Sequence, residues 1–243
     1  MSISIISDLH ITSNECDGFK AFIKFINHDK VRSSDSIYLL GDIFDVFLGS
    51  QSGYIVKYSE FFKEIEKQIE LGKKIVFFKG NHDFSYKSIL DSFKKNQQIH
   101  MDFYRWEKID IINGKKYYFS HGDFLDYDNS SYRLYIKLIS SWPILKIASI
   151  IPFNVLNTIG EWASKSSSYY GKKKFNYLEY KEKFRIGFKR IAKEYKVDTV
   201  VCGHTHIHED FKCAGKHYLN NGYPPRDNYF IYIDGVNDRL ISL

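Results

Sequence analysis

The amino-acid sequence predicts an α/β fold that begins with a parallel β-sheet. Short apolar runs alternate with segments of helical periodicity through the first 95 residues, which is the pattern of βαβ units. An Asn-Gly pair between two β-rich runs then predicts a hairpin. The length of 243 residues suits one domain, with room for an insertion.

Each element of the first part follows from a local pattern. Short apolar runs predict buried strands, and apolar residues three and four positions apart predict amphipathic helices. In chain order, these strands and helices are expected at residues 2–6, 19–29, 36–40, 54–71, 74–78 and 86–95. Because parallel sheets bind ligands beyond the carboxyl ends of their strands, those ends are where a site is expected.

The second part of the chain has a different pattern. Asn113-Gly114 is the two-residue turn of the expected hairpin. The elements expected here are hairpin arms at 102–112 and 115–120, helices at 130–168 (interrupted at Pro143 and Pro152) and 174–196, a strand at 198–202 and short antiparallel strands in the tail. The serine and lysine runs within 166–174 predict a flexible loop.

Cysteine use and hydropathy indicate the compartment. Cys16, Cys202 and Cys213 are odd in number and far apart, so no disulfide framework is expected. Cys202 lies in a β-rich run, where a small core residue is expected. No leader pattern precedes the first strand, and no run approaches about 18 apolar residues. These features predict a cytoplasmic protein in a reducing environment.

The positive charge is concentrated in one segment. The net charge is +6, and residues 130–174 contain seven Lys or Arg residues against one acid, Glu161. The rest of the chain is therefore neutral. This asymmetry predicts an anionic partner for the segment.

Five expected strands end in clusters of polar residues. The clusters are Asp8-Leu9-His10, Gly41-Asp42-Ile43-Phe44-Asp45, Gly80-Asn81-His82-Asp83, His121-Gly122-Asp123 and Gly203-His204-Thr205-His206. Carboxylate and amide oxygens are hard ligands and imidazoles are borderline. A set of this kind without thiolate suits Mn²⁺, Fe or Zn²⁺.

The spacing within the clusters suggests how the side chains converge. Asp8 and His10 are two residues apart, so an extended strand end would place both side chains on one side. The number of ligands fits two metal ions that share a carboxylate. Simpler roles are open at this point, because Asp8, Asp42 and Asn81 could cap helices and the histidines could be satisfied polar residues.

The motifs DxH, GDxxD, GNHD, HGD and GHTH occur in this order. From residue 1 to about residue 210 the sequence resembles the calcineurin-like metallophosphoesterases. The resemblance implies a four-layer α/β/β/α sandwich that hydrolyses phosphoester or phosphoanhydride bonds. It also implies two divalent metal ions, of which Mn²⁺ is expected, with Fe or Zn²⁺ as alternatives.

The resemblance implies a role for each motif residue. The first ion would be bound by Asp8, His10 and His206, the second by Asn81, His121 and His204, and Asp42 would bridge both. A hydroxide bridging the ions would be the nucleophile. His82 would be the general acid for the leaving oxygen, with Asp45 orienting its ring.

The segment 124–175 suggests a substrate. It is rich in Ile, Leu, Trp and Lys, and it resembles the helical cap of UDP-2,3-diacylglucosamine hydrolases, which act in lipid A biosynthesis. The resemblance implies a single domain over residues 1–243 with this cap inserted, an acylated sugar-nucleotide substrate, and contact with the inner face of a membrane through the basic cap. Asp126 and Arg133 are candidate substrate contacts. The alternative for the segment is a helical hairpin that packs its apolar face on the core.

Two departures from family patterns keep other functions open. Val46 stands where phosphoprotein phosphatases have arginine, which argues against that activity. His82 stands where the best-known lipid A hydrolases have arginine, so a cytosolic phosphodiesterase or phosphatase for nucleotides or other small phosphoesters is the alternative. A non-catalytic, metal-stabilised interaction module is a third hypothesis. No nucleic-acid partner is expected, because the basic stretch is helical and apolar rather than a groove of Arg and stacking aromatics.

Overall fold

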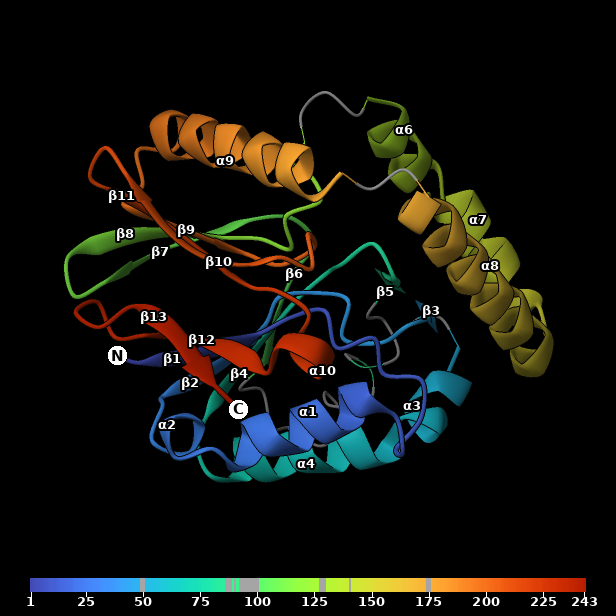
Figure 1. The fold of residues 1–243 in the computed structure, drawn as a ribbon. Helices are drawn as coiled ribbons and strands as arrows, with labels where there is room; N and C mark the ends of the chain where they lie inside the picture. Colours follow the sequence, from blue (N-terminus) through green and yellow to red (C-terminus); the bar gives the residue numbers. More distant parts are fainter. Residues whose placement is uncertain are drawn as a thin grey trace.

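The computed structural model has two stacked β-sheets with helices on the outer face of each (Figure 1). It describes residues 1–48, 51–85, 89, 91, 101–126, 130–139, 141–173 and 176–243, with residues 84–85, 130–133, 135 and 165–173 described as backbone only. The α/β/β/α order of the layers confirms the predicted fold class.

Among the described residues, the first sheet has six strands in the order β13-β12-β1-β2-β4-β6. The strands are β1 (Ile3–Ile6), β2 (Ser36–Leu39), β4 (Lys74–Phe78), β6 (Met101–Tyr104), β12 (Tyr229–Ile233) and β13 (Arg239–Ser242). The neighbours β1, β2, β4 and β6 are parallel, as the alternating pattern predicts. The two C-terminal strands extend the sheet antiparallel beside β1.

Helices cover the outer face of this sheet (Figure 1). They are α1 (Asp17–Asn27), α2 (Asp29–Arg32), α3 (Gly53–Lys57) and α4 (Ser59–Glu70). The helix predicted at 54–71 is interrupted at Tyr58, whose φ of −108° and ψ of 28° leave the helical region. The helix predicted at 86–95 falls almost wholly outside the described residues.

The second sheet has the order β10-β11-β9-β8-β7 in the described part of the chain, and α9 (Tyr177–Glu194) covers it. Its strands are β7 (Lys108–Ile112), β8 (Lys115–Phe119), β9 (Thr199–Cys202), β10 (His208–Cys213) and β11 (Lys216–Asn221). The Asn113-Gly114 hairpin is confirmed, and both turn residues have the positive φ that a type I′ turn needs. The single arm predicted at 102–112 is wrong, because residues 105–107 carry the chain from β6 in one sheet to β7 in the other.

Three apolar cores separate the four layers, and side-chain alternation along the strands builds them. In β4, Ile75 and Phe77 face the helices, whereas Val76 and Phe78 face the second sheet. A strand buried on both faces is a continuous apolar run, which is why these strands could be predicted. Cys202 is fully buried in the third core, under α9, as predicted.

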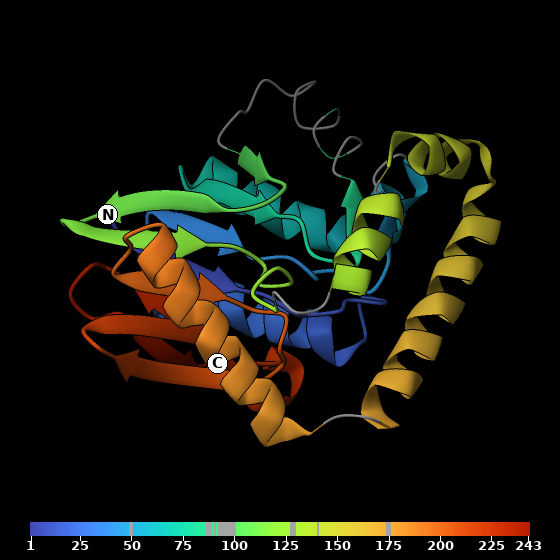
Figure 2. The ribbon, with the colours of Figure 1, turned by 90° about the horizontal axis from the view of Figure 1, so that it is seen from above.

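Three helices stand beside the four layers rather than within them (Figures 1 and 2). They are α6 (Ser130–Ile139), α7 (Trp142–Ile150) and α8 (Phe153–Lys173). The prediction of a flexible loop within 166–174 is wrong for residues 166–173, because α8 continues to Lys173. Serine and lysine are tolerated in helices, so their runs did not mark a break.

Polar contacts attach these helices to α3 and the chain before it. The Gln51 side-chain amide lies within hydrogen-bond distance of the carbonyl oxygens of Ala148 and Ile151, at 2.9 and 2.8 Å. Lys57 donates to Asn157 and to Glu161 of α8.

Much of the apolar surface of α6, α7 and α8 remains exposed. The exposed side chains are Leu134, Leu138, Trp142, Ile144, Ile147, Ile150, Val155, Ile159 and Trp162. A hairpin that packs its whole apolar face on the core is therefore excluded. Within the described residues, no helix combines the length and apolar character needed to cross a membrane.

Candidate metal centre

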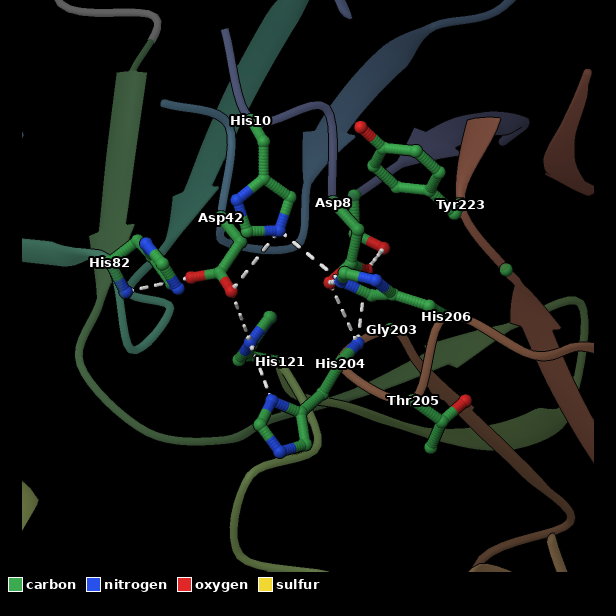
Figure 3. A network of polar contacts seen from close by, with 12 residues as sticks. Asp8, His10, Asp42, His82, His121, Gly203, His204, Thr205, His206 and Tyr223 are labelled. Atoms are coloured by element: carbon green, nitrogen blue, oxygen red, sulfur yellow. Dashed lines mark hydrogen bonds and ion pairs between the residues drawn. The ribbon is translucent and has the colours of Figure 1, made fainter. Parts of the chain in front are cut away.

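The chain segments that follow β1, β2, β4, β8 and β9 meet at one end of the two sheets (Figure 3). All seven residues predicted as metal ligands are found there. The first sheet contributes Asp8, His10, Asp42 and Asn81, and the second contributes His121, His204 and His206.

One group of ligand atoms consists of Asp8, His10 and His206. The Nε2 atoms of His10 and His206 are 3.2 Å apart, and His206 Nε2 is 3.4 Å from Asp8 Oδ1. Asp8 is fully buried, and its carboxylate accepts hydrogen bonds from the backbone N–H of His204 and from the Ser7 hydroxyl. These contacts fix the carboxylate toward the two imidazoles.

A second group consists of Asp42, His121 and His204, with Asn81 beside it. Asn81 Oδ1 is 3.1 Å from His121 Nε2 and 2.9 Å from His204 Nδ1. The other ring nitrogen of His121 lies 2.8 Å from the Leu40 carbonyl. A ring N–H donated to that carbonyl leaves Nε2 as a lone-pair donor facing the group.

Asp42 lies between the two groups. Its Oδ2 is 3.4 Å from His121 Nε2 and 3.8 Å from His10 Nε2. The other oxygen, Oδ1, accepts the backbone N–H of His82 at 2.8 Å. Asp42 is the carboxylate that faces both ligand groups.

The backbone turns sharply at these residues. Positive φ angles occur at Asp8, His10, Asp42, His204 and His206. The predicted extended strand end is therefore wrong for Asp8 and His10, which converge through left-handed backbone. Such conformations cost about 1–3 kcal/mol each, and they concentrate at functional sites.

Neither Asp8 nor Asp42 caps a helix. Cys16 caps α1, and Ser52 precedes α3. Asn81 is followed by a short strand, β5 (Asp83–Ser85), which pairs with β3 (Phe47–Leu48). The simpler helix-cap role is therefore wrong for these three residues.

Gly80 allows the loops to approach each other closely. A Cβ atom at this position would lie 2.2 Å from Asp42 Oδ1 and 2.3 Å from the Asp42 backbone nitrogen. Any larger residue would displace the carboxylate that faces both groups. The glycine of GNHD is therefore required by packing rather than by its φ angle.

His82 and Asp45 lie at the edge of the ligand groups, near His10. His82 Nδ1 is 2.7 Å from the main-chain carbonyl of Asp45, so Asp45 contacts the ring through its backbone. The Asp45 carboxylate instead accepts a hydrogen bond of 2.6 Å from Ser164 of α8. Burial disfavours a charged His82, but the charge of Asp42, the Asp45 carbonyl and the charges of Asp45 and Asp83 together outweigh burial and raise the pKa of the imidazole.

The electrostatics of the centre are set by its buried carboxylates. Burial opposes ionisation of Asp42, but the charges of His121, His82 and His10 together outweigh it and hold the Asp42 pKa well below its usual range. Burial likewise opposes a charged His121, and the Asp42 carboxylate raises the His121 pKa to about 10. His204 is buried beside His121, and its pKa is lowered to about 3.

Several supporting residues were missed by the sequence analysis. The Tyr223 ring stacks on His206, with centroids 5.0 Å apart, and Arg226 donates to the His206 carbonyl. Both lie at α10 (Pro224–Asp227) in the C-terminal tail, which carries no recognisable motif. The Ser7 hydroxyl also contacts Asn221 at 2.9 Å. Only the NNGYPPR stretch after a strand hinted at this contribution.

The structure describes the side chain of only one of the two candidate substrate contacts, Asp126. Asp126 is partly buried and forms an ion pair with Lys183 of α9. Arg133 belongs to α6, and its side chain is outside the described part of the structure. Of these two candidates, only the side chain of Asp126 can be placed, and its ion-pair partner is Lys183 rather than a residue of the ligand groups.

The seven donors fit divalent metal ions. They are carboxylate and amide oxygens and imidazole nitrogens, a mixture suited to Mn²⁺, Fe or Zn²⁺. The ion pairs of the buried carboxylates are with histidines: His206 for Asp8, and His10 and His121 for Asp42. Buried carboxylates need a positive partner, and a divalent ion in each group would supply it.

The fold and this donor set define a metal-dependent phosphoester hydrolase. Residues 1–208 match the family model described as calcineurin-like phosphoesterase. The chain therefore belongs to the calcineurin-like phosphoesterase family.

Named relatives agree with this assignment. The UDP-2,3-diacylglucosamine hydrolase of Photorhabdus laumondii is 27% identical over 214 residues, covering 86% of this chain and 85% of that protein. The one of Wigglesworthia glossinidia brevipalpis is 27% identical over 208 residues, covering 85% and 80%. The solved structure of an archaeal phosphodiesterase aligns over 100% of both chains with 16% identity and a TM-score of 0.50, a likeness of fold.

Proposed function

We propose that this chain hydrolyses the phosphoanhydride bond of UDP-2,3-diacylglucosamine and releases UMP and lipid X. The observation that carries the proposal is two groups of metal-ligand side chains, with Asp42 between them, at the common end of two sheets. The substrate is suggested by relatives named UDP-2,3-diacylglucosamine hydrolase that match over most of this chain.

The proposed metal centre holds two ions. One ion would bind Asp8, His10 and His206, the other Asn81, His121 and His204, and Asp42 would contact both. Divalent ions there would polarise the phosphoryl oxygens and lower the pKa of an attacking water. Mn²⁺ is the expected metal, with Fe and Zn²⁺ as alternatives.

His82 is the proposed general acid for the leaving oxygen. It lies beside His10 and Asp42 and belongs to neither of the two ligand groups, which supports this role. The Asp45 carbonyl holds its Nδ1, which leaves Nε2 to donate a proton to the departing phosphate. Proton donation by a positioned side chain typically contributes about 10²–10⁴-fold to the rate.

The helices α6, α7 and α8 are the proposed cap, inserted at 124–175 within a single domain of residues 1–243. Their exposed apolar side chains could accept acyl chains or rest on a membrane surface. Lys137 and Lys146 add positive charge to the same helices. These features support an acylated, anionic substrate and a position at the cytoplasmic face of a membrane.

The test is direct assay of the purified protein. With Mn²⁺ and UDP-2,3-diacylglucosamine, we expect UMP and lipid X in equal amounts, measured by chromatography and mass spectrometry. UDP-N-acetylglucosamine, which lacks the two acyl chains, should react much more slowly. An Asp42→Ala variant is the control for a contaminating hydrolase, and its activity should fall to background.

Other outcomes would redirect the assignment. Turnover of bis(p-nitrophenyl) phosphate without UMP release would reject the acylated substrate and favour the cytosolic phosphodiesterase alternative. Equal rates for acylated and non-acylated sugar nucleotides would reject the role of the α6–α8 surface. Full activity of Asp42→Ala would reject the metal centre itself.

A further inference from the structure

A cavity of about 370 Å³ lies beside the candidate metal centre. Its walls come from the β6–β7 connection, the end of β8, α6 and α9. The lining residues used below are Lys79, Arg105, Trp106, Ser120, His121 and Lys137. The volume is within the range of about 300–1,000 Å³ that small-molecule sites occupy.

The cavity carries an excess of positive charge. Lys79, Arg105 and Lys137 face two acids, Asp123 and Glu107. Lys79 is only 9% exposed, and it shares the lining of the cavity with Arg105 and Lys137. Cations held close together at some electrostatic cost are expected where an anion binds.

One wall of the cavity is aromatic. Trp106 is 38% exposed, although the edge of Phe124 packs against it with centroids 4.8 Å apart. The Arg105 guanidinium lies 4.9 Å from the centre of the Trp106 ring. An exposed indole next to cations is suited to a flat ring that carries a phosphate.

A polar group in the lining also lacks a partner. The Ser120 hydroxyl is buried, and it has no hydrogen-bond partner among the described residues. Burying a hydroxyl without a partner costs free energy. A ligand oxygen or nitrogen in the cavity would satisfy it.

The cavity adjoins the metal centre through His121. This residue lines the cavity and belongs to the second ligand group. We propose that the cavity binds a nucleoside 5′-phosphate, with its base against Trp106 and its phosphate among Lys79 and Arg105. The inference rests on the proposed function. It assigns the nucleotide half of the substrate to this cavity and leaves the acylated half to α6–α8.

Direct binding of UMP tests the proposal. Titration calorimetry would compare UMP, ribose 5-phosphate and inorganic phosphate on the wild-type protein, with and without Mn²⁺. We expect UMP to bind most tightly. Trp106→Leu should weaken UMP binding about tenfold, because base stacking is lost, and should leave ribose 5-phosphate unchanged. Trp106→Phe should retain most of the affinity.

Arg105→Ala provides a second, independent variant and should weaken both UMP and ribose 5-phosphate. Lys212→Ala is its matched control, because it removes the same charge from the exposed surface of β10. Trp142→Leu on α7 is the control for loss of a tryptophan outside the cavity.

The proposal fails if UMP binds no more tightly than ribose 5-phosphate or phosphate, since the site would then recognise an anion alone. It also fails if Trp106→Leu and Arg105→Ala bind UMP as the wild type does. Failure of the proposed function looks different. UMP would bind and respond to these variants, but the acylated sugar nucleotide would not be hydrolysed.

Discussion

Ser164 connects the helices outside the four layers to the candidate centre. Its hydroxyl donates to the Asp45 carboxylate, while the Asp45 backbone holds the His82 ring. The same carboxylate oxygen lies 3.8 Å from His10 Nδ1. A displacement of α8 would therefore move Asp45, which contacts both His10 and His82. We regard Ser164 as a positioning residue.

Replacing Ser164 with alanine should lower kcat about tenfold, because supporting hydrogen bonds of this kind typically contribute about 10–100-fold. KM should change little, and Ser164→Thr should restore most of kcat by returning the hydroxyl. Ser149→Ala is the control, since its hydroxyl donates to the Lys146 carbonyl within α7. Steady-state kinetics would measure these effects, and an equal loss in both serine variants would contradict the positioning role.

His82→Ala should separate acid catalysis from metal binding. We expect kcat for the phosphoanhydride to fall about 10²–10⁴-fold, and we expect a smaller loss for bis(p-nitrophenyl) phosphate, whose leaving group needs no proton. Mn²⁺ affinity, measured by calorimetry, should be unchanged. His82, His10 and Asp45 also form a group that could hold an ion, so weakened Mn²⁺ binding would identify His82 as a ligand instead.

At the scale of elements, α8 is held close to the loop that carries Asp45. A Cβ atom on Gly160 would lie 2.5 Å from Val46 Cγ1. Valine is stiff about its single side-chain bond and cannot easily move aside. The glycine therefore sets how closely α8 approaches the centre.

Gly160→Ala tests this contact with opposing effects. Alanine should favour the helix by about 1 kcal/mol, but overpacking against Val46 should cost about 1–3 kcal/mol. We expect Gly160→Ala to lower Tm. The double variant Gly160→Ala, Val46→Ala should lose less Tm than either single variant. Calorimetric melting of the wild type, the two single variants and the double variant would measure these changes. If the two single changes in Tm simply added in the double variant, Gly160 and Val46 would not be in tight contact.

Sequence patterns predicted the buried elements better than the surface ones. Residues 75–78 are all apolar because both faces of β4 are buried there, so their pattern was unambiguous. The connection at residues 105–107 contains no glycine or proline, so its sequence did not mark the passage of the chain from one sheet to the other. The break at Tyr58 was equally invisible, since tyrosine fits a helix.

The candidate site was predictable where residues are rare and adjacent in sequence. Aspartates, histidines and an asparagine at strand ends pointed to the metal-ligand set, which the structure brings together. Tyr223 and Ser164 were not predictable, because each reaches the centre by long-range packing from an ordinary helical or loop sequence. The left-handed backbone at Asp8 and His10 also has no signature in their residue types.

At the scale of the whole molecule, stability should depend on metal and pH together. The His121 pKa lies above its ordinary value of 6.5, at about 10. In the metal-free protein, the protonated ring therefore contributes its full stabilisation below pH 6.5. This contribution is lost as pH rises toward about 10. A metal ion requires the neutral ring and would replace that charge.

We therefore expect Mn²⁺ to raise Tm more at pH 8.5 than at pH 6.5. At a free concentration 100 times the Kd, the ion should stabilise the fold by about 2.7 kcal/mol. Thermal melts with Mn²⁺ and with a chelator, at three pH values, would measure the difference. A Tm increment that does not vary with pH would mean that His121 is not a ligand.

Each ligand group draws on both sheets: His206 meets Asp8 and His10, and His121 and His204 meet Asp42. On our proposal, each ion is therefore a cross-link between the two sheets, in addition to their shared apolar core and to hydrogen bonds such as Tyr38 to Asp110 and Ser7 to Asn221. Neither sheet could then separate from the other without releasing both ions. Amide hydrogens at the ends of β1 and β9 should consequently become protected together when the ions bind.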